Sequence, residues 1–406
     1  MDSLITAAAR ALAAGDPLGA LNRIALRNDA SALALRGIAM SQLGDFTRAR
    51  TLLRGAARAF GPKESIARAR CAVAEAEIAL VSRDLGWPAR ALDAACHVLD
   101  SHGDAINAAH ARYLIARHHL MTGQLDAAEQ TIAVIDTSTL PPALRAAHEL
   151  VAAGIAIRRV RSAPARDALA RAGIAARQAG IPALVAEVES AMEALRTPVA
   201  RLLARGDEAP LLLDAVEGWF ASGALIVDAC RMTVRQGDAI VPLARRPVLF
   251  ALARTLAQAW PGDVARDTLI ATAFRMRHPD ETHRARLRVE IGRLRKALGK
   301  LADVRATPQG FALVPASQAE VVVMTHPVEQ AHAAVLACLA DGESWSSSAL
   351  ALALGTSQRT VQRALDALAD KGKVQPVGSG RARRWMTPPL TGFTTALLLP
   401  APLPGA

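Results

Sequence analysis

Apolar residues recur every three to four positions along the first half of the chain, and this period predicts amphipathic helices. The clearest unit is ALALRGIAMSQLGDFTRARTLLRGAARAF, in which one helix ends near Gly44 and a second begins at Phe46. Gly44 is suited to a left-handed C-cap, and Asp45 can cap the next helix. A Gly-x-x-x-x-Ala pattern recurs at Gly15/Ala20, Gly44/Ala49, Gly86/Ala91 and Gly123/Ala128, with a weaker copy at Ala163/Ala168. The small alanine would let two helices cross closely.

This half resembles the tetratricopeptide repeat family. The LGDFTRA segment matches the turn of that family, and Gly37 and Ala39 match its small positions. The copies are unevenly spaced and mostly lack the family's aromatic residues. The resemblance implies a helical tetratricopeptide-like domain over residues 1–205, whose concave surface would bind a protein or peptide. A generic helical bundle is the alternative.

Residues 206–223 interrupt the helical period with Gly and Pro, which predicts a linker. Three strand-like runs follow, ALIVDAC, RMTVRQ and AIVPLA, with Gly237-Asp238 as a hairpin turn. Helices are then expected at PVLFALARTLAQAW, at ARDTLIATAF and over 284–300, before two short extended runs around Pro308-Gln309-Gly310. The predicted order is therefore strands, three helices and a hairpin.

The helix RARLRVEIGRLRKALGK, residues 284–300, carries seven cationic residues and one acid, Glu290. Its inward stripe is Leu287, Ile291, Leu294 and Leu298, at i, i+4, i+7 and i+11. Its outward stripe is Arg286, Val289, Arg293, Lys296 and Lys300, and Arg284, Arg288 and Arg295 flank the inward stripe. Because the outward stripe holds no acid, a polyanion is the expected partner. We expect Arg286 and Val289 to reach base edges, and Arg293 and Lys296 to meet phosphates. An acidic protein is the alternative partner.

Residues 224–316 resemble the winged helix-turn-helix domain of OmpR/PhoB-type response regulators, which antibiotic regulatory protein activators share. The segments LIVDACRMTVRQGDAIVPL, VARDTLIATAF, RLRVEIGRLRKALG and VRATPQGFALV carry the match. The resemblance implies that helix 284–300 is a DNA recognition helix. The hairpin lacks the arginine that the family places in the wing, and Arg305 is the nearest substitute. No receiver domain is evident, so control by aspartyl phosphorylation is not implied.

Residues 327–386 resemble a second winged helix-turn-helix of a general bacterial type, in which Ser-x-Arg-Thr-Val-x-Arg-Ala-Leu opens the recognition helix. Ser357 would be the N-cap. The residues expected to contact DNA are Ser357, Gln358, Arg359, Gln362 and Arg363 on the helix, and Arg381, Arg383 and Arg384 in the wing. A fold used for dimerisation or domain packing is the alternative. Residues 387–406 form an apolar tail without an assigned role.

Composition narrows the fold class and the function. With 51% apolar and 3% aromatic residues, the 406-residue chain is expected to be mainly α. The resemblances imply a helical repeat domain followed by two small α+β domains. The net charge of +11 fits an anionic partner. Four dispersed cysteines suggest buried thiols rather than a metal site. Signal, membrane-spanning and catalytic motifs are not recognised, so a non-enzymatic cytoplasmic protein without cofactors is expected.

These observations lead to one functional hypothesis and its competitors. The chain is expected to be a bacterial, sequence-specific regulator of transcription that binds double-stranded DNA as a homodimer at the nucleoid. The repeat domain would receive a protein, peptide or effector, or mediate dimerisation. The first alternative is an interaction scaffold whose winged helices bind proteins, and the second is non-specific nucleoid binding.

Overall fold

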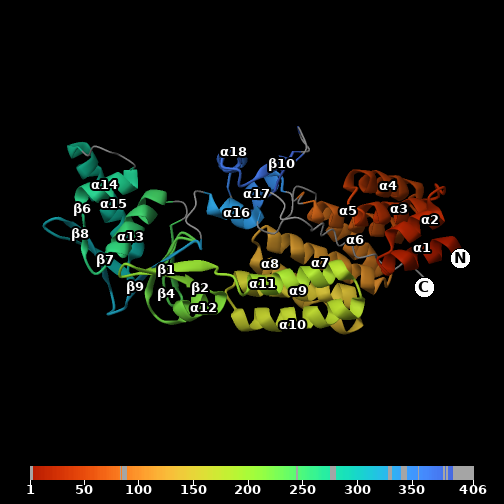
Figure 1. Ribbon diagram of the computed structural model, residues 1–406, viewed down its shortest axis with the longest axis horizontal. Helices are drawn as coiled ribbons and strands as arrows, with labels where there is room; N and C mark the ends of the chain where they lie inside the picture. The colour runs from red at the N-terminus through yellow and green to blue at the C-terminus, as the bar shows by residue number, and fades with distance from the viewer. Residues whose placement is uncertain are drawn as a thin grey trace. The chain divides into compact units, whose positions relative to one another are not determined.

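The computed structural model describes residues 3–82, 84, 89–243, 246–274, 280–327, 332–339, 345–354, 356–377, 380 and 383–386. The chain divides into two compact units. One comprises residues 1–159, 163–193 and 331–406, and the other comprises 160–162 and 194–330. Helices predominate, so the expectation of a mainly α protein with small sheets is confirmed (Figure 1).

The first unit begins with a series of helical hairpins. Its elements are α1 (Ser3–Ala13), α2 (Pro17–Ile24), α3 (Ala30–Gln42), α4 (Phe46–Ala59), α5 (Ser65–Val81), α6 (Ala89–Ser101), α7 (Ala105–Met121), α8 (Leu125–Ala133), the 3-10 turn η1 (Thr137–Thr139), α9 (Pro142–Arg158), α10 (Ser162–Ala179) and α11 (Pro182–Ala194). Each helix from α1 to α8 contacts the next one. The first helix of each hairpin also contacts the first helix of the following hairpin, from α1 through α3, α5 and α7 to α9. The hairpins therefore stack in chain order.

The turn between α3 and α4 has the predicted chemistry. Gly44 has a φ of +85°, and the Asp45 carboxylate accepts a hydrogen bond from the backbone N–H of Arg48 at 3.0 Å. Gly15 and Asp16 repeat this arrangement before α2. Gly103 and Asp104 repeat it before α7, a copy that the sequence pattern missed.

The alanines of the recurring pattern mostly occupy helix contacts. Ala20, Ala49 and Ala128 are fully buried, as a close helix crossing requires. Ala91 is exposed, so its predicted role at a crossing is wrong. Its partner Gly86 lies outside the described residues.

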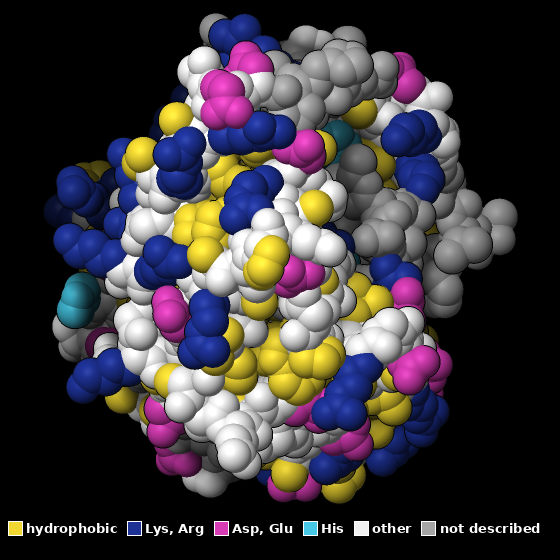
Figure 2. All heavy atoms as spheres, turned by 90° about the vertical axis from the view of Figure 1, so that its left-hand side faces the viewer, with side chains coloured by type: hydrophobic (Ala, Val, Ile, Leu, Met, Phe, Trp, Pro, Cys, Tyr) yellow, Lys and Arg dark blue, Asp and Glu magenta, His cyan; other side chains and the backbone are white. Residues whose placement is uncertain are grey.

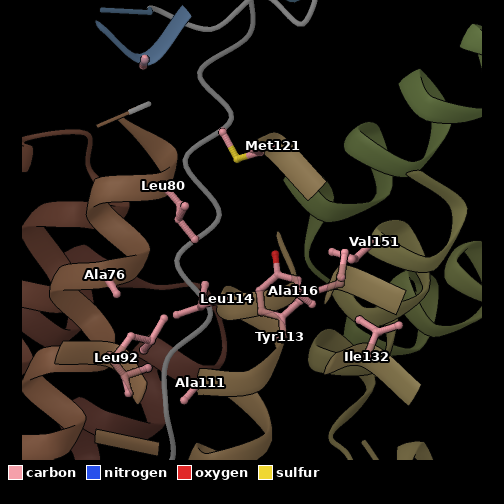
Figure 3. Packing of buried hydrophobic residues seen from close by; sticks show 14 of the residues in the cluster. Ala76, Leu80, Leu92, Ala111, Tyr113, Leu114, Ala116, Met121, Ile132 and Val151 are labelled. Atoms are coloured by element: carbon pink, nitrogen blue, oxygen red, sulfur yellow. The ribbon is translucent and has the colours of Figure 1, made fainter. Parts of the chain in front are cut away.

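Helix α7 lies at the centre of the apolar core of this unit. Leu114 points towards Ala76 and Leu80 of α5 and Leu92 of α6, whereas Tyr113 and Ala116 lie on the side of Ile132 and Val151 (Figure 3). Helix α7 is thus buried on two sides, which explains why it lacks a single apolar stripe.

The last described part of the first unit has the element order predicted for residues 327–386. It contains α16 (Ala333–Leu339), α17 (Ser347–Ala353), α18 (Gln358–Ala369), β10 (Gln375–Val377) and β11 (Arg384–Met386). Strands β10 and β11 pair antiparallel, and Trp385 also forms a backbone bridge to Trp345. The predicted apolar tail, residues 387–406, lies outside the described residues.

The second unit contains a six-stranded sheet in the order β2-β1-β9-β3-β4-β5. Its strands are β1 (Ala200–Ala204), β2 (Asp207–Leu211), β3 (Leu225–Asp228), β4 (Thr233–Gln236), β5 (Ala239–Pro242) and β9 (Val321–Thr325). The predicted turn at Gly237-Asp238 joins β4 to β5. Strand β9 lies between β1 and β3, pairs parallel to β3, and is buried throughout.

The rest of this unit is three helices with a three-stranded sheet. The helices are α13 (Pro247–Ala259), α14 (Arg266–Phe274) and α15 (Glu281–Leu298), and the strands β6 (Asp263–Ala265), β8 (Gly310–Pro315) and β7 (Ala302–Ala306) pair in that order. Strands β7 and β8 form the predicted hairpin. Apolar side chains of all three helices and of both sheets share one core.

The structure corrects two predicted boundaries. The expected linker 206–223 contains β2 and helix α12 (Leu213–Ala221), and Leu211, Leu213 and Val216 there are buried. The expected helical domain 1–205 extends too far, because β1 belongs to the sheet of the second unit. Gly206 and Pro210 lie in the β1–β2 hairpin, Gly218 lies within α12, and Gly223 follows that helix, so these residues interrupt helical periodicity without removing ordered structure.

Candidate nucleic-acid interface

Helix α15 is fixed at both ends by local contacts. The Asp280 carboxylate caps its first turn by accepting the backbone N–H of His283 at 2.9 Å, and this hydrogen bond lowers the pKa of Asp280. Gly299, with a φ of +54°, follows its last residue. Leu287, Ile291, Leu294 and Leu298 are the buried residues of the helix, as the spacing predicted.

The outward stripe of α15 is exposed, also as predicted. Arg286, Val289, Arg293, Lys296 and Lys300 all lie on the surface, and Val289 is 54% exposed. Lys296 and the flanking Arg288 have no partner among the described residues. A cationic face is therefore presented opposite the leucine and isoleucine stripe.

The outward stripe of α15 holds no acid, but three arginines of the helix pair with carboxylates: Arg284, Arg293 and Arg295, the last with Asp303 at 3.5 Å. Arg293 donates to the carboxylate of Glu290 at 2.7 Å, and Arg284 donates to that of Glu281 at 2.8 Å. Both pairs are three residues apart, a separation at which helical side chains meet. Glu281 precedes the basic stretch that the sequence pattern singled out, so it was not counted.

Arg286 and Arg295 are also held by neighbouring elements. The Arg286 guanidinium lies 4.4 Å from the ring centroid of Phe274 on α14. Arg295 donates from Nε to the carbonyl oxygen of Val304 at 2.6 Å, which ties α15 to β7. These contacts fix the direction of long side chains that would otherwise lose rotamer freedom when they bind.

A basic groove lies between α15 and the β7–β8 hairpin. Its walls include the four arginines Arg266, Arg284, Arg288 and Arg295, with Phe311 and Ala306 on the hairpin side. Arg266 also donates to the carbonyl oxygens of Thr307 and Pro308, at 3.0 and 2.9 Å. The sequence pattern did not single out Arg266, although a cation at the start of a predicted helix was a usable signal.

A second groove borders the opposite flank of α15. It is lined by Arg246 and Pro247 at the start of α13, and by Glu290, Arg293 and Lys296 of α15. The N-terminus of α13 adds partial positive charge there. Arg246 was also missed by sequence reasoning, because only the fold brings it beside α15.

The β7–β8 turn is held by hydrogen bonds of the Thr307 side chain and carries little charge. The Thr307 hydroxyl contacts the Asp263 carboxylate and accepts the backbone N–H of Gly310. Arg305 is exposed on β7, and its backbone register pairs it with Ala312. Arg305 is therefore accessible, as expected of the only cation in this hairpin.

Helix α18 of the first unit has fewer side chains available for DNA than the sequence predicted. Ser357 caps it, accepting the Thr360 N–H at 3.1 Å, and Arg359 and Arg363 are exposed, as expected. Gln358 donates to Ser347 at 3.0 Å, and the half-buried Gln362 donates to Asp366 at 2.9 Å. The two amides that were expected to contact DNA are thus engaged within the protein.

The arginines predicted for the second wing differ in their surroundings. Arg383 is exposed and lies 4.4 Å from the ring centroid of the buried Trp385, whereas Arg384 is half-buried on β11. Arg381 lies outside the described residues. The residues predicted on α15 belong to the second unit, and those predicted on α18 belong to the first unit.

Basic side chains are spread over the surface drawn in Figure 2, with Asp and Glu side chains between them. They do not merge there into one continuous patch. The two grooves beside α15 therefore indicate a binding surface more clearly than the overall distribution of charge does.

Other kinds of site find little support in the described residues. They contain no group of three or more His, Cys, Asp or Glu that could hold a metal ion. Cys71 and Cys96 are buried, and burial raises the pKa of Cys71 and of the half-buried Cys230 to about 12. Within the described chain, no helix has the length and apolar character needed to span a bilayer.

Comparison with known proteins adds no assignment: no family model, curated protein or solved structure matches the chain.

Proposed function

We propose that the chain is a sequence-specific transcription regulator that binds double-stranded DNA through α15 of its second unit. The observation that carries this proposal is the position of the exposed α15 face between two basic grooves. A helix in the major groove of B-DNA has a phosphate backbone on either side. The grooves supply cations at both flanks, while the face between them is free to approach base edges.

The chemistry of the face supports duplex DNA over a general anion. Arg286 is exposed towards the N-terminal half of α15, and its planar guanidinium can donate two hydrogen bonds to guanine. Arg288 and Lys296 have no described partner, so binding phosphate would break no internal contact. On this proposal, 224–316 is a winged helix-turn-helix whose hairpin stands beside the phosphate backbone.

The stacked hairpins of the first unit are proposed to form a tetratricopeptide-like domain that binds a protein or peptide or mediates homodimerisation. Residues 327–386 are proposed as a second winged helix. Because Gln358 and Gln362 are engaged internally, the exposed Arg359 and Arg363 are its stronger candidates for contact with DNA.

The decisive experiment reverses charge on α15. The full chain carrying Arg286→Glu and Arg293→Glu is titrated against fluorescent genomic duplex fragments, and anisotropy is measured at several salt concentrations. We expect at least about a 100-fold loss of affinity, and each lost phosphate contact should flatten the plot of log K against log salt by about 0.9.

A matched control distinguishes the effect of charge at α15 from the effect of the net charge of the chain. Arg48→Glu with Arg58→Glu makes the same charge change on exposed positions of α4. This control should retain most of the affinity, and circular dichroism melts should show both variants folded. Unchanged duplex affinity in the α15 variant would contradict the proposal. A wild-type chain that ignores duplex DNA but captures one acidic protein would favour the scaffold alternative.

A further inference from the structure

The turn of the β7–β8 hairpin extends beyond the strand pairing that holds the rest of the hairpin. The ladder between β7 and β8 ends where Ala306 pairs with Phe311, and the ladder between β6 and β8 ends where Ala265 pairs with Gly310. Residues 307–309 lie outside both ladders. The ladders alone therefore do not hold the carbonyl groups of this turn in place.

Arg266, the first residue of α14, holds these carbonyl groups. Its Nη2 donates to the carbonyl oxygen of Thr307 at 3.0 Å, and its Nη1 donates to that of Pro308 at 2.9 Å. The two acceptors belong to consecutive residues, and the planar guanidinium can bind both at once. Arg266 pairs with no carboxylate among the described residues, and it lies 5.6 Å from the ring centroid of the buried Phe311. Its hydrogen bonds are thus directed to the hairpin turn.

Gln309 is the side chain that the turn presents to solvent. It is exposed, and it has no hydrogen-bond partner among the described residues. Its carboxamide can donate to a phosphate oxygen, as glutamine side chains do in protein–DNA complexes. A neutral hydrogen bond is lost when its donor moves by a fraction of an ångström, whereas the attraction between charges falls slowly with distance. A contact through Gln309 therefore depends closely on where the turn is held.

We infer that Arg266 is a positioning residue, which holds the hairpin turn so that Gln309 contacts the phosphate backbone of bound DNA. This inference rests on the proposed DNA-binding function and adds a residue of α14 that acts through the hairpin. Arg266 acts through its two hydrogen bonds to the turn and not through its charge. Substitution by lysine distinguishes these two roles.

The principal variant is Arg266→Lys in the full chain. Lysine keeps the charge, but its single ammonium group cannot reproduce the fork of two hydrogen bonds. In anisotropy titrations with the genomic duplex fragments, we expect affinity to fall by about 3- to 10-fold, the effect of losing one neutral hydrogen bond. The dependence on salt should stay the same, because the number of cations is unchanged. Wild-type affinity in Arg266→Lys overturns the inference.

A double-mutant cycle identifies the group through which Arg266 acts. Gln309→Ala should weaken binding by about 3- to 10-fold in the wild type, but by less than about 2-fold in Arg266→Lys, where the turn is already displaced. Arg293→Ala, in the groove on the opposite flank of α15, should cost the same in both backgrounds. Additive effects of Arg266→Lys and Gln309→Ala would mean that Arg266 contacts DNA itself or acts only on folding, and either result overturns the inference.

Hydrogen exchange without DNA tests the positioning role separately from the proposed function. The peptide that contains residues 307–311 should exchange faster in Arg266→Lys than in the wild type, whereas peptides of α15 should exchange alike. Unchanged exchange of the turn overturns the inference, even if the chain binds DNA. A wild-type chain that does not bind duplex DNA overturns the proposed function, and with it the contact assigned to Gln309, whatever the exchange of the turn.

Discussion

The guanidinium of Arg293 is paired with the carboxylate of Glu290, with 2.7 Å between Nη1 and Oε1. The Arg293 side chain is 64% exposed, whereas that of Glu290 is only 13% exposed. Glu290, the single acid of the basic stretch, lines the groove beside α13. Its carboxylate holds the Arg293 side chain on the outward face.

Neutralising this acid should strengthen DNA binding. In Glu290→Gln the side chain keeps its size but loses its charge, so Arg293 is released and the face gains one net positive charge. Because exposed pairs are worth roughly 0.2–1 kcal/mol, we expect about a 2- to 5-fold gain in duplex affinity at low salt, which high salt reduces. Anisotropy titrations at two salt concentrations would measure it.

The control for this variant is Glu75→Gln in the first unit. Glu75 pairs with Arg54 at 3.1 Å, with side-chain exposures of 15% and 62%, so the two pairs are closely matched. Glu75→Gln should leave duplex affinity unchanged. Equal gains in both variants would mean that net charge, not the α15 face, sets the affinity.

Gly292 offers a test in which stability and binding change in opposite directions. It lies in the interior of α15 with open space around it, so Gly292→Ala should raise the free energy of unfolding by about 0.5–1 kcal/mol. If α15 lies deep in the major groove, the added methyl should weaken duplex binding several-fold. Denaturant titrations and anisotropy give the two values.

Gly55 of α4 is the matched control, because it is also a helical glycine with open space around it. Gly55→Ala should give a comparable stability gain with no change in binding. A Gly292→Ala chain that binds as tightly as the wild type would argue against close contact by this part of α15.

Gly310 should not tolerate any side chain. An added Cβ atom would lie 1.7 Å from the carbonyl oxygen of Val264, because β8 pairs with β6 at this point. Gly310→Ala must displace backbone, so we expect a loss of about 2–4 kcal/mol in the free energy of unfolding. Gly218→Ala in α12, where space is open, should cost no stability. Similar effects of both substitutions would contradict this account of the hairpin.

His148 should make the first unit less stable in mild acid. Burial lowers its pKa below the ordinary 6.5, so the unfolded chain binds a proton more readily than the folded chain does. The stability contributed by neutral His148 is therefore present above about pH 6.5, and it is lost as the pH falls towards the folded pKa. Circular dichroism melts between pH 7.5 and 5.5 should show a falling midpoint.

His148→Gln removes this titration and should flatten the dependence of the midpoint on pH. His326 of the second unit also has a pKa lowered by burial, so the double variant His148→Gln/His326→Gln should flatten it further. The slope against pH is the relevant readout, since either substitution can change stability at all pH values. An unchanged slope in the double variant would rule out these two groups as the cause.

Much of the candidate interface was predictable because it depends on local spacing. The burial of Leu287, Ile291, Leu294 and Leu298 follows from the 3.6-residue period, and that period also places Arg286 and Val289 on the open side. Caps such as Asp45 and Ser357 follow from side chains that bond backbone N–H groups three residues away. Each of these features depends only on residues that are close together in the chain.

The features that sequence reasoning missed involve residues far apart in the chain. Strand β9 was missed because four apolar residues between two expected domains gave no sign of a partner strand. Arg246 and Arg266 were missed because their proximity to α15 depends on how α13, α14 and the hairpin pack. In the first unit, the buried pair of His110 and Glu77 likewise comes from two different helices.

The sequence alone thus determined the helical character of the chain, the two faces of α15 and the caps of its helices, because these are set by neighbours within a few residues. Tertiary structure decided where β9 and α12 lie, which arginines are engaged, and that basic grooves border α15 on both flanks. Those properties depend on contacts between distant segments, whose geometry is fixed only when the core forms.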